Sequence, residues 1–250
     1  MYISKFRNFI SKDSFQNNTF YLGIFLLLSA PAISSFLLFF SIIFNFLKSK
    51  KSYFKDYSNI PFFFASLFMI ISCIVNSFNR NSLYIDIYDI KLTWIGLFNW
   101  IPYFWLYWAL KEFTQTSLQR KKILIYLLFG TIPLFLTGFL QYFFKIHGPF
   151  SFFFGLVRWY SRPIENYDGL SGIFNNANYA GTWLNIILPV SLTFAFEKKR
   201  NQLSKYFSIA IFFSVILCTL LTYSRNSWLG LIVGLILIGG INTLRWLVPA

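Results

Sequence analysis

The stretch IPFFFASLFMIISCIVNSF, residues 60–78, carries no charged side chain and decides the class of this protein. A helix needs about 20 consecutive, mostly apolar residues to cross the hydrocarbon core of a bilayer. Six further stretches are similarly apolar: Phe20–Leu47, Thr93–Phe113, Ile123–Phe144, Ile173–Phe196, Tyr206–Tyr223 and Ser227–Trp246. The sequence therefore predicts an all-α fold, a polytopic integral membrane helical bundle with seven to eight transmembrane helices.

The composition supports this class and excludes others. The chain is 56% hydrophobic and only 12% charged, whereas a soluble domain is about 25% charged. The net charge of +14 does not indicate a nucleic-acid partner, because the basic residues alternate with membrane-length runs and so act as topology signals. Cys73 and Cys218 lie within separate apolar runs and are expected to behave as small buried hydrophobes. We expect no disulfide, no metal and no cofactor.

Basic residues set the expected orientation. The connections after Leu47, Phe113 and Phe196 are rich in Lys and Arg, and the connections between them are poorer. Because cytoplasmic loops carry the excess of positive charge, the rich connections are predicted to be cytoplasmic. We expect a multi-pass protein of the cell inner (plasma) membrane, with residues 1–19 as a cytoplasmic segment and residues 20–250 as the transmembrane domain.

Pro31 divides the first apolar run into two arms. Proline removes a backbone donor and disfavours helix at the residue before it. The run is therefore either one long kinked span or two short helices that turn at Pro31. The two-helix arrangement keeps the basic amino-terminal segment in the cytoplasm, and we favour it. Its short arms require strong tilt or local thinning of the bilayer.

The longest connection, residues 145–172, is predicted to be an outer-face loop. Its run Phe150–Tyr160 is too short to span a membrane, and we expect an interfacial helix or a re-entrant turn there. Arg158 and its aromatic neighbours either anchor the loop at the interface, or Arg158 and Arg162 contact an anionic headgroup or a substrate phosphate.

Two polar segments, GIFNNANYAG at 172–181 and LTYSRNSWLG at 221–230, lie at ends of apolar runs and fall on the same predicted outer face. Asn176 and Asn178 either cap the following helix or contact substrate at its positive end. We expect Asn178 about one turn inside the span, where its amide needs a partner. Arg225, next to Ser224, is either a snorkelling interface residue or a bidentate phosphate ligand.

These two segments resemble motifs of the O-antigen ligase and polymerase superfamily. The first is similar to that family's Gly-x-Phe-x-Asn-Pro-Asn-x-x-Ala signature, and the second is similar to its Leu-Thr-x-Ser-Arg-Gly-x-Trp/Leu-Leu-Gly motif. The opening Gly23–Leu38 also looks like the first helices of cyanobacterial members. Ala177 replaces the usual proline and Asn226 the usual glycine. Family members also carry a large loop with a catalytic histidine after the Ser-Arg helix, and His147 does not match it by position.

The resemblance implies transfer of a glycan from a polyprenyl diphosphate to a lipid-borne acceptor in the synthesis of cell-envelope polysaccharide. The implied partners are membrane lipid and a polyprenyl-diphosphate-linked glycan. The implied substrate-binding residues are Arg225, Ser224, Asn176, Asn178, Arg158 and Arg162, and no catalytic base is evident. The chain would be such a transferase or its amino-terminal portion. The alternatives are a transporter of a small anion such as bicarbonate, and a truncated chain without activity of its own.

Overall fold

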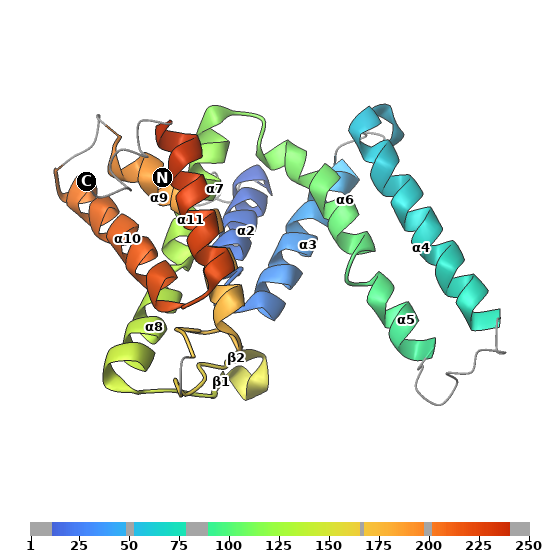
Figure 1. Cartoon of the computed structure of the whole chain (residues 1–250). Helices are drawn as coiled ribbons and strands as arrows, with labels where there is room; N and C mark the ends of the chain where they lie inside the picture. The colour runs from blue at the N-terminus through green and yellow to red at the C-terminus, as the bar shows by residue number, and fades with distance from the viewer. Residues whose placement is uncertain (1–11, 49–52, 79–89, 166–167, 198–201, 241–250) are drawn as a thin grey trace. The chain divides into compact units, whose positions relative to one another are not determined.

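The computed structural model describes residues 12–48, 53–78, 90–165, 168–197 and 202–240 (Figure 1). These residues are mostly helical, which confirms the predicted helical class. The chain forms two compact units. Unit 1 comprises residues 1–20 and 38–120, and unit 2 comprises residues 21–37 and 121–250.

Three helical stretches of the described residues are long and apolar enough to cross a membrane: Tyr57–Phe78, Ser117–Phe144 and Ser204–Leu221. Two more, Pro31–Asn45 and Arg225–Ile238, are apolar but shorter. These stretches support the membrane class of the protein. They fall short of the predicted seven to eight spans.

The first apolar run forms two helices, α2 (Lys12–Leu26) and α3 (Pro31–Lys48). The chain leaves α2 at a turn over residues 27–30, directly before Pro31. In unit 2 the Ser34 hydroxyl of α3 donates to the Gly23 carbonyl of α2 at 2.7 Å. The preference for two helices over one long kinked span is therefore confirmed, and the side of the membrane on which the amino terminus lies stays a prediction.

Unit 1 contains α4 (Ile60–Phe78), α5 (Ile90–Leu97) and α6 (Ile101–Leu110). Helix α4 begins and ends where the sequence predicts. The stretch Thr93–Phe113 does not form one continuous helix, because turns at residues 98–100 separate α5 from α6, and its crossing of a membrane stays a prediction. Pro102 lies in the first turn of α6. It has no amide hydrogen to continue an α5 ladder, whereas at a helix start that hydrogen is not needed.

An ion pair links two polar segments of unit 1 that flank its apolar helices. The Asp56 carboxylate accepts from the Lys111 ammonium and from the Ser58 amide and hydroxyl. The hydrogen bond from Lys111, followed by that from Ser58, holds the pKa of Asp56 below its usual range.

Helix α7 (Ser117–Gly130) begins in unit 1 and continues into unit 2. The helices wholly within unit 2 are α8 (Ile132–Phe144), α9 (Ala177–Ala195), α10 (Gln202–Leu221) and α11 (Arg225–Gly239). Helix α9 packs against both α10 and α11. Its residues Leu184, Ile187 and Leu188 are fully buried in the core of the unit.

Small residues bring α9 and α11 close together. A Cβ atom on Gly181 of α9 would lie 1.7 Å from the Ser227 hydroxyl oxygen of α11. A Cβ atom on Gly230 of α11 would lie 2.2 Å from the Asn185 amide nitrogen of α9. Lipid tails are as apolar as leucine, so close backbone approach of this kind is a main source of helix association in a membrane.

The run 150–160 forms a β-hairpin, so the predicted interfacial helix is wrong. Strands β1 (Phe150–Phe152) and β2 (Val157–Trp159) pair in antiparallel register, with Ser151 opposite Arg158. Short runs rich in aromatic residues have high strand propensity, and the turn at Gly155, where φ is +88°, lets the chain reverse.

Candidate functional site

A polar pocket of about 270 Å³ lies in unit 2 where the 145–172 loop meets the starts of α9 and α11. Both polar sequence segments contribute to its wall, so they meet at one end of unit 2, and the side of the membrane on which they lie stays a prediction. Its lining residues are Arg162, Pro163, Asp168, Gly169, Ser171, Asn175, Asn176, Ala177, Asn178, Thr222, Tyr223 and Ser224.

The start of α9 forms one side of the pocket. Asn176 has extended backbone angles, and its side-chain oxygen accepts from the Asn178 amide at 2.7 Å. Asn176 is therefore the N-cap of the helix, as one of the two interpretations of the sequence predicted. Asn178 is the second residue of α9 and is exposed. It thus lies in the first turn of α9 and not one turn inside the helix, and its depth in the membrane stays a prediction.

The start of α11 forms the opposite side. The buried hydroxyl of Ser224 accepts from the Ser227 amide at 3.4 Å, which makes Ser224 the N-cap of α11. Tyr223 before it has a φ of +50°, in the left-handed region that non-glycine residues rarely adopt. This sharp reversal between α10 and α11 brings the beginning of α11 to the pocket.

Gln141 of α8 fixes the loop that carries the pocket residues. Its side chain is 1% exposed. Its amide nitrogen donates to the Arg162 carbonyl and to the Ser171 hydroxyl, and its amide oxygen accepts from the Ser171 and Gly172 amides at 3.0 and 2.8 Å. Sequence reasoning missed this residue. The feature of the sequence that could have revealed it is a polar amide side chain within an apolar run, because such an amide is costly in a membrane unless it is hydrogen-bonded.

Two further contacts close the loop onto the end of α10. The Leu170 amide donates to the Leu221 carbonyl at 2.8 Å. A Cβ atom on Gly169 would lie 1.7 Å from the Thr222 carbonyl oxygen, so only glycine permits this approach. At the rim, the hydroxyls of Tyr142 and Tyr223 are hydrogen-bonded at 2.7 Å. The pocket wall is thus built from segments far apart in the sequence.

The pocket combines two helix starts with one cationic and one anionic residue, Arg162 and Asp168. The first backbone amides of a helix lack intrahelical partners, and the helix dipole makes that end positive. Two such ends, those of α9 and α11, border the same pocket, together with the cationic side chain of Arg162. Asn175, Asn176 and Asp168 add amide and carboxylate groups that suit sugar hydroxyls.

The structure places four of the six predicted binding residues in the pocket wall: Arg162, Asn176, Asn178 and Ser224. Arg158 lies on β2 in the hairpin and is not part of the wall. Arg225 is the first residue of α11, is exposed, and is likewise not part of the wall. The geometry separates the two loop arginines that the sequence grouped together.

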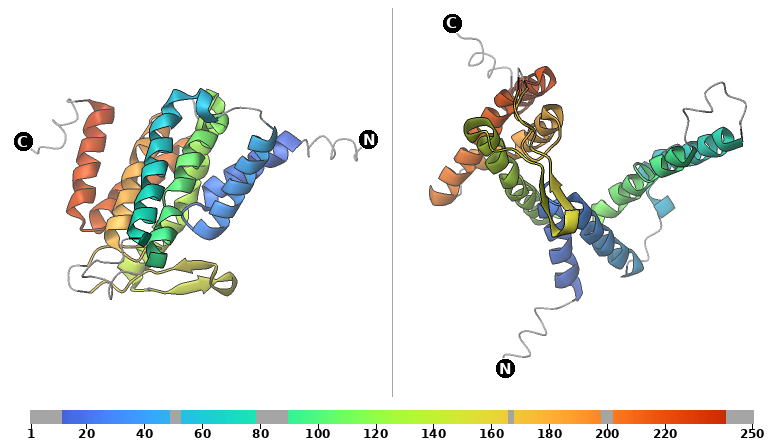
Figure 2. Two further views of the ribbon diagram at one scale, coloured as in Figure 1. Left: turned by 90° about the vertical axis from the view of Figure 1, so that its right-hand side faces the viewer. Right: turned by 90° about the horizontal axis from the view of Figure 1, so that it is seen from below.

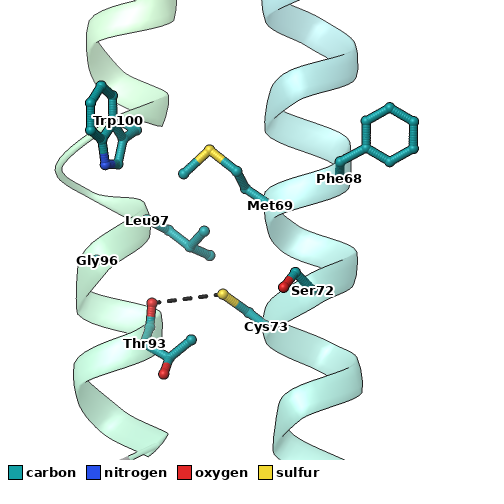
Figure 3. Close-up of a pocket in the computed structure, with 8 residues that line it drawn as sticks. All are labelled: Phe68, Met69, Ser72, Cys73, Thr93, Gly96, Leu97 and Trp100. Carbon is teal, nitrogen blue, oxygen red and sulfur yellow. Dashed lines mark hydrogen bonds between the residues drawn. The ribbon is translucent and has the colours of Figure 1, made fainter.

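A second cavity, of about 450 Å³, lies between α4 and α5 in unit 1 (Figure 3). Met69, Cys73 and Leu97 point between the helices, and the Cys73 thiol donates to the Thr93 carbonyl at 3.7 Å. Its wall is mostly apolar and includes no charged side chain. The polar pocket of unit 2 is therefore the better candidate for recognition of a charged substrate.

Comparisons with protein-family models, with curated proteins and with solved structures find no match to this chain.

Proposed function

We propose that this chain is an O-antigen ligase-like membrane glycan transferase, or the amino-terminal part of one, which moves a glycan from a polyprenyl diphosphate to a lipid-borne acceptor. In this proposal the chain crosses the inner (plasma) membrane seven or eight times, and the polar pocket opens on the periplasmic face. Residues 145–172 form part of that face.

One observation carries the proposal. The two segments that resemble the family's motifs lie about 40 residues apart in the sequence, and they line one polar pocket at two helix starts. A leaving diphosphate develops negative charge, which preorganised donors stabilise. The starts of α9 and α11 and the Arg162 guanidinium supply such donors. Asp168 is a carboxylate in the wall and is proposed as the base toward an acceptor hydroxyl.

Binding of a prenyl diphosphate to the full chain in detergent micelles tests the proposal. Farnesyl diphosphate is a soluble probe with the same head chemistry, and its affinity is measured by calorimetry. Hydrogen bonds to charged groups contribute about 1.5–3 kcal/mol, so Arg162→Ala is expected to weaken binding roughly 10-fold to 100-fold.

Lys205→Ala is the matched control. It also removes one exposed positive charge, and Lys205 lies near the start of α10, whereas the pocket lies beyond the end of that helix. Equal affinity of the Arg162→Ala and Lys205→Ala variants would refute a phosphate role for the pocket. If bicarbonate displaces the probe and vesicles with the chain show bicarbonate flux, the small-anion transporter replaces the transferase.

A further inference from the structure

The tip of the β-hairpin presents apolar side chains to the surroundings. Phe153 is 70% exposed, Phe154 is fully exposed, and Leu156 is 62% exposed. Phe153 and Phe154 have φ values of +51° and +56°, followed by Gly155 at +88°. The tip therefore presents its phenyl rings away from the core of unit 2.

The base of the hairpin is held firmly within unit 2. The Trp159 indole donates to the Ser29 carbonyl at 2.7 Å, and the Tyr160 amide donates to the Ile173 carbonyl at 3.0 Å. Val157 is buried, and the Phe152 ring lies edge-on to Trp159 with centroids 5.2 Å apart. Because these contacts attach the base of the hairpin to unit 2, the packing of unit 2 determines where the tip lies.

The hairpin lies beside the start of α9 and extends across the direction of the unit 2 helices (Figure 2). The α7–α8 stretch and α10 are long and apolar enough to span a bilayer. An element at the end of such helices that runs across them lies along the membrane surface. With those helices across a bilayer, the hairpin would lie at the level where lipid headgroups meet acyl chains.

A basic side chain, that of Arg158, lies next to the hairpin turn. Nη2 of Arg158 lies 3.7 Å from where a Cβ atom on Gly155 would be, so its guanidinium lies against the turn. Apolar side chains next to a basic group are typical of peptides that insert into the interface, because the apolar groups enter the acyl region and the cation contacts lipid phosphate.

We propose that the hairpin tip, Phe153–Leu156, inserts into the lipid leaflet next to the polar pocket, with Arg158 on lipid phosphates. A lipid surface is favoured over a protein partner because the spanning helices already hold the tip at the bilayer. The proposal does not depend on the transferase function. It gives Arg158 a role different from that of Arg162, which lies in the pocket wall.

Site-specific fluorescence in vesicles tests this proposal. The full chain carries Cys73→Ala and Cys218→Ala, and Phe154→Cys is labelled with an environment-sensitive nitrobenzoxadiazole dye. Glu165→Cys, an exposed position in the same loop, is the control. The vesicles contain phosphatidylcholine and phosphatidylglycerol, with iodide on both sides as an aqueous quencher or with lipids spin-labelled near the headgroup.

The expected result is a blue-shifted emission at position 154, loss of most of the iodide quenching seen at position 165, and strong quenching by the spin-labelled lipid. Equal iodide quenching at both positions would place the tip in water and overturn the proposal. Protection from both quenchers would show that protein, such as a second copy of the chain, covers the tip, and would also overturn it. Leu156→Cys repeats the measurement if the Phe154→Cys chain does not fold.

Discussion

Replacement of Gln141 by leucine tests whether one buried side chain holds the pocket loop in place. Gln141 makes four hydrogen bonds to the loop, two from its amide nitrogen and two to its amide oxygen. Leucine is of similar size but makes none. We therefore expect the Gln141→Leu chain to keep its helices and lose the fixed geometry of residues 162–172.

The expected size of the effect follows from these bonds. A typical hydrogen bond contributes about 1 kcal/mol net, so the loss of the four bonds costs about 4 kcal/mol in the free energy of loop opening. Because 1.4 kcal/mol is a factor of ten, the loop is expected to open roughly 1,000-fold more often. Buried donors left unpaired, such as the Ser171 and Gly172 amides, add to this cost.

Amide hydrogen exchange of the full chain in micelles, followed by mass spectrometry, measures this opening locally. We expect exchange at Ser171 and Gly172 to accelerate by that factor in Gln141→Leu, while exchange within α10 stays unchanged. Gln119→Leu is the matched control, because Gln119 is half-buried and its side-chain oxygen accepts from Thr116, next to the start of α7. Unchanged exchange at Ser171 and Gly172 in a folded Gln141→Leu chain would refute the role of Gln141 in holding the loop.

Three further outcomes are expected. Gly181→Ala should lower the free energy of unfolding, measured in a detergent titration, by about 1–3 kcal/mol, because its Cβ would meet the Ser227 hydroxyl. Adding Ser227→Gly should restore part of that loss. A Gly181→Ala chain as stable as the original would contradict this packing of α9 against α11. The pKa of Asp56 is lowered beside Lys111 in the folded chain. The pair therefore stabilises the fold at pH values above the ordinary carboxyl pKa of about 3.9, and this stabilisation is lost as the pH falls through the lower pKa of the folded state. Asp56→Asn should therefore flatten that acid decline in thermal melts, and identical profiles would speak against the pair. Arg225 is exposed and lies outside the pocket wall, so Arg225→Lys is expected to keep near-normal glycan transfer, as an interfacial anchor does. Loss of transfer as large as in Arg225→Ala would instead restore the bidentate phosphate role, because lysine lacks the two-pronged guanidinium.

The sequence by itself predicted the membrane class and the helix break at Pro31, but not the breaks that separate α5 from α6 and α7 from α8. Uncharged apolar length predicts a spanning helix, as in Ile60–Phe78, because the cost of burying charge in lipid applies to each segment independently. Pro31 begins α3, where its missing donor is not needed, and Asn176 caps α9 through an amide two residues away. Each of these effects acts within about one helical turn, so the local sequence is enough to predict it.

Only the tertiary structure decided which residues share a site. Gln141 reaches Ser171 across 30 positions, and Arg158 and Arg162, four residues apart, separate because a β-hairpin ends between them. Pairing of this kind depends on how the 145–172 loop closes onto α8 and α10, and no local preference encodes that closure. The polar groups were visible in the sequence, whereas their convergence required helices packed closely enough to hold the loop in one conformation.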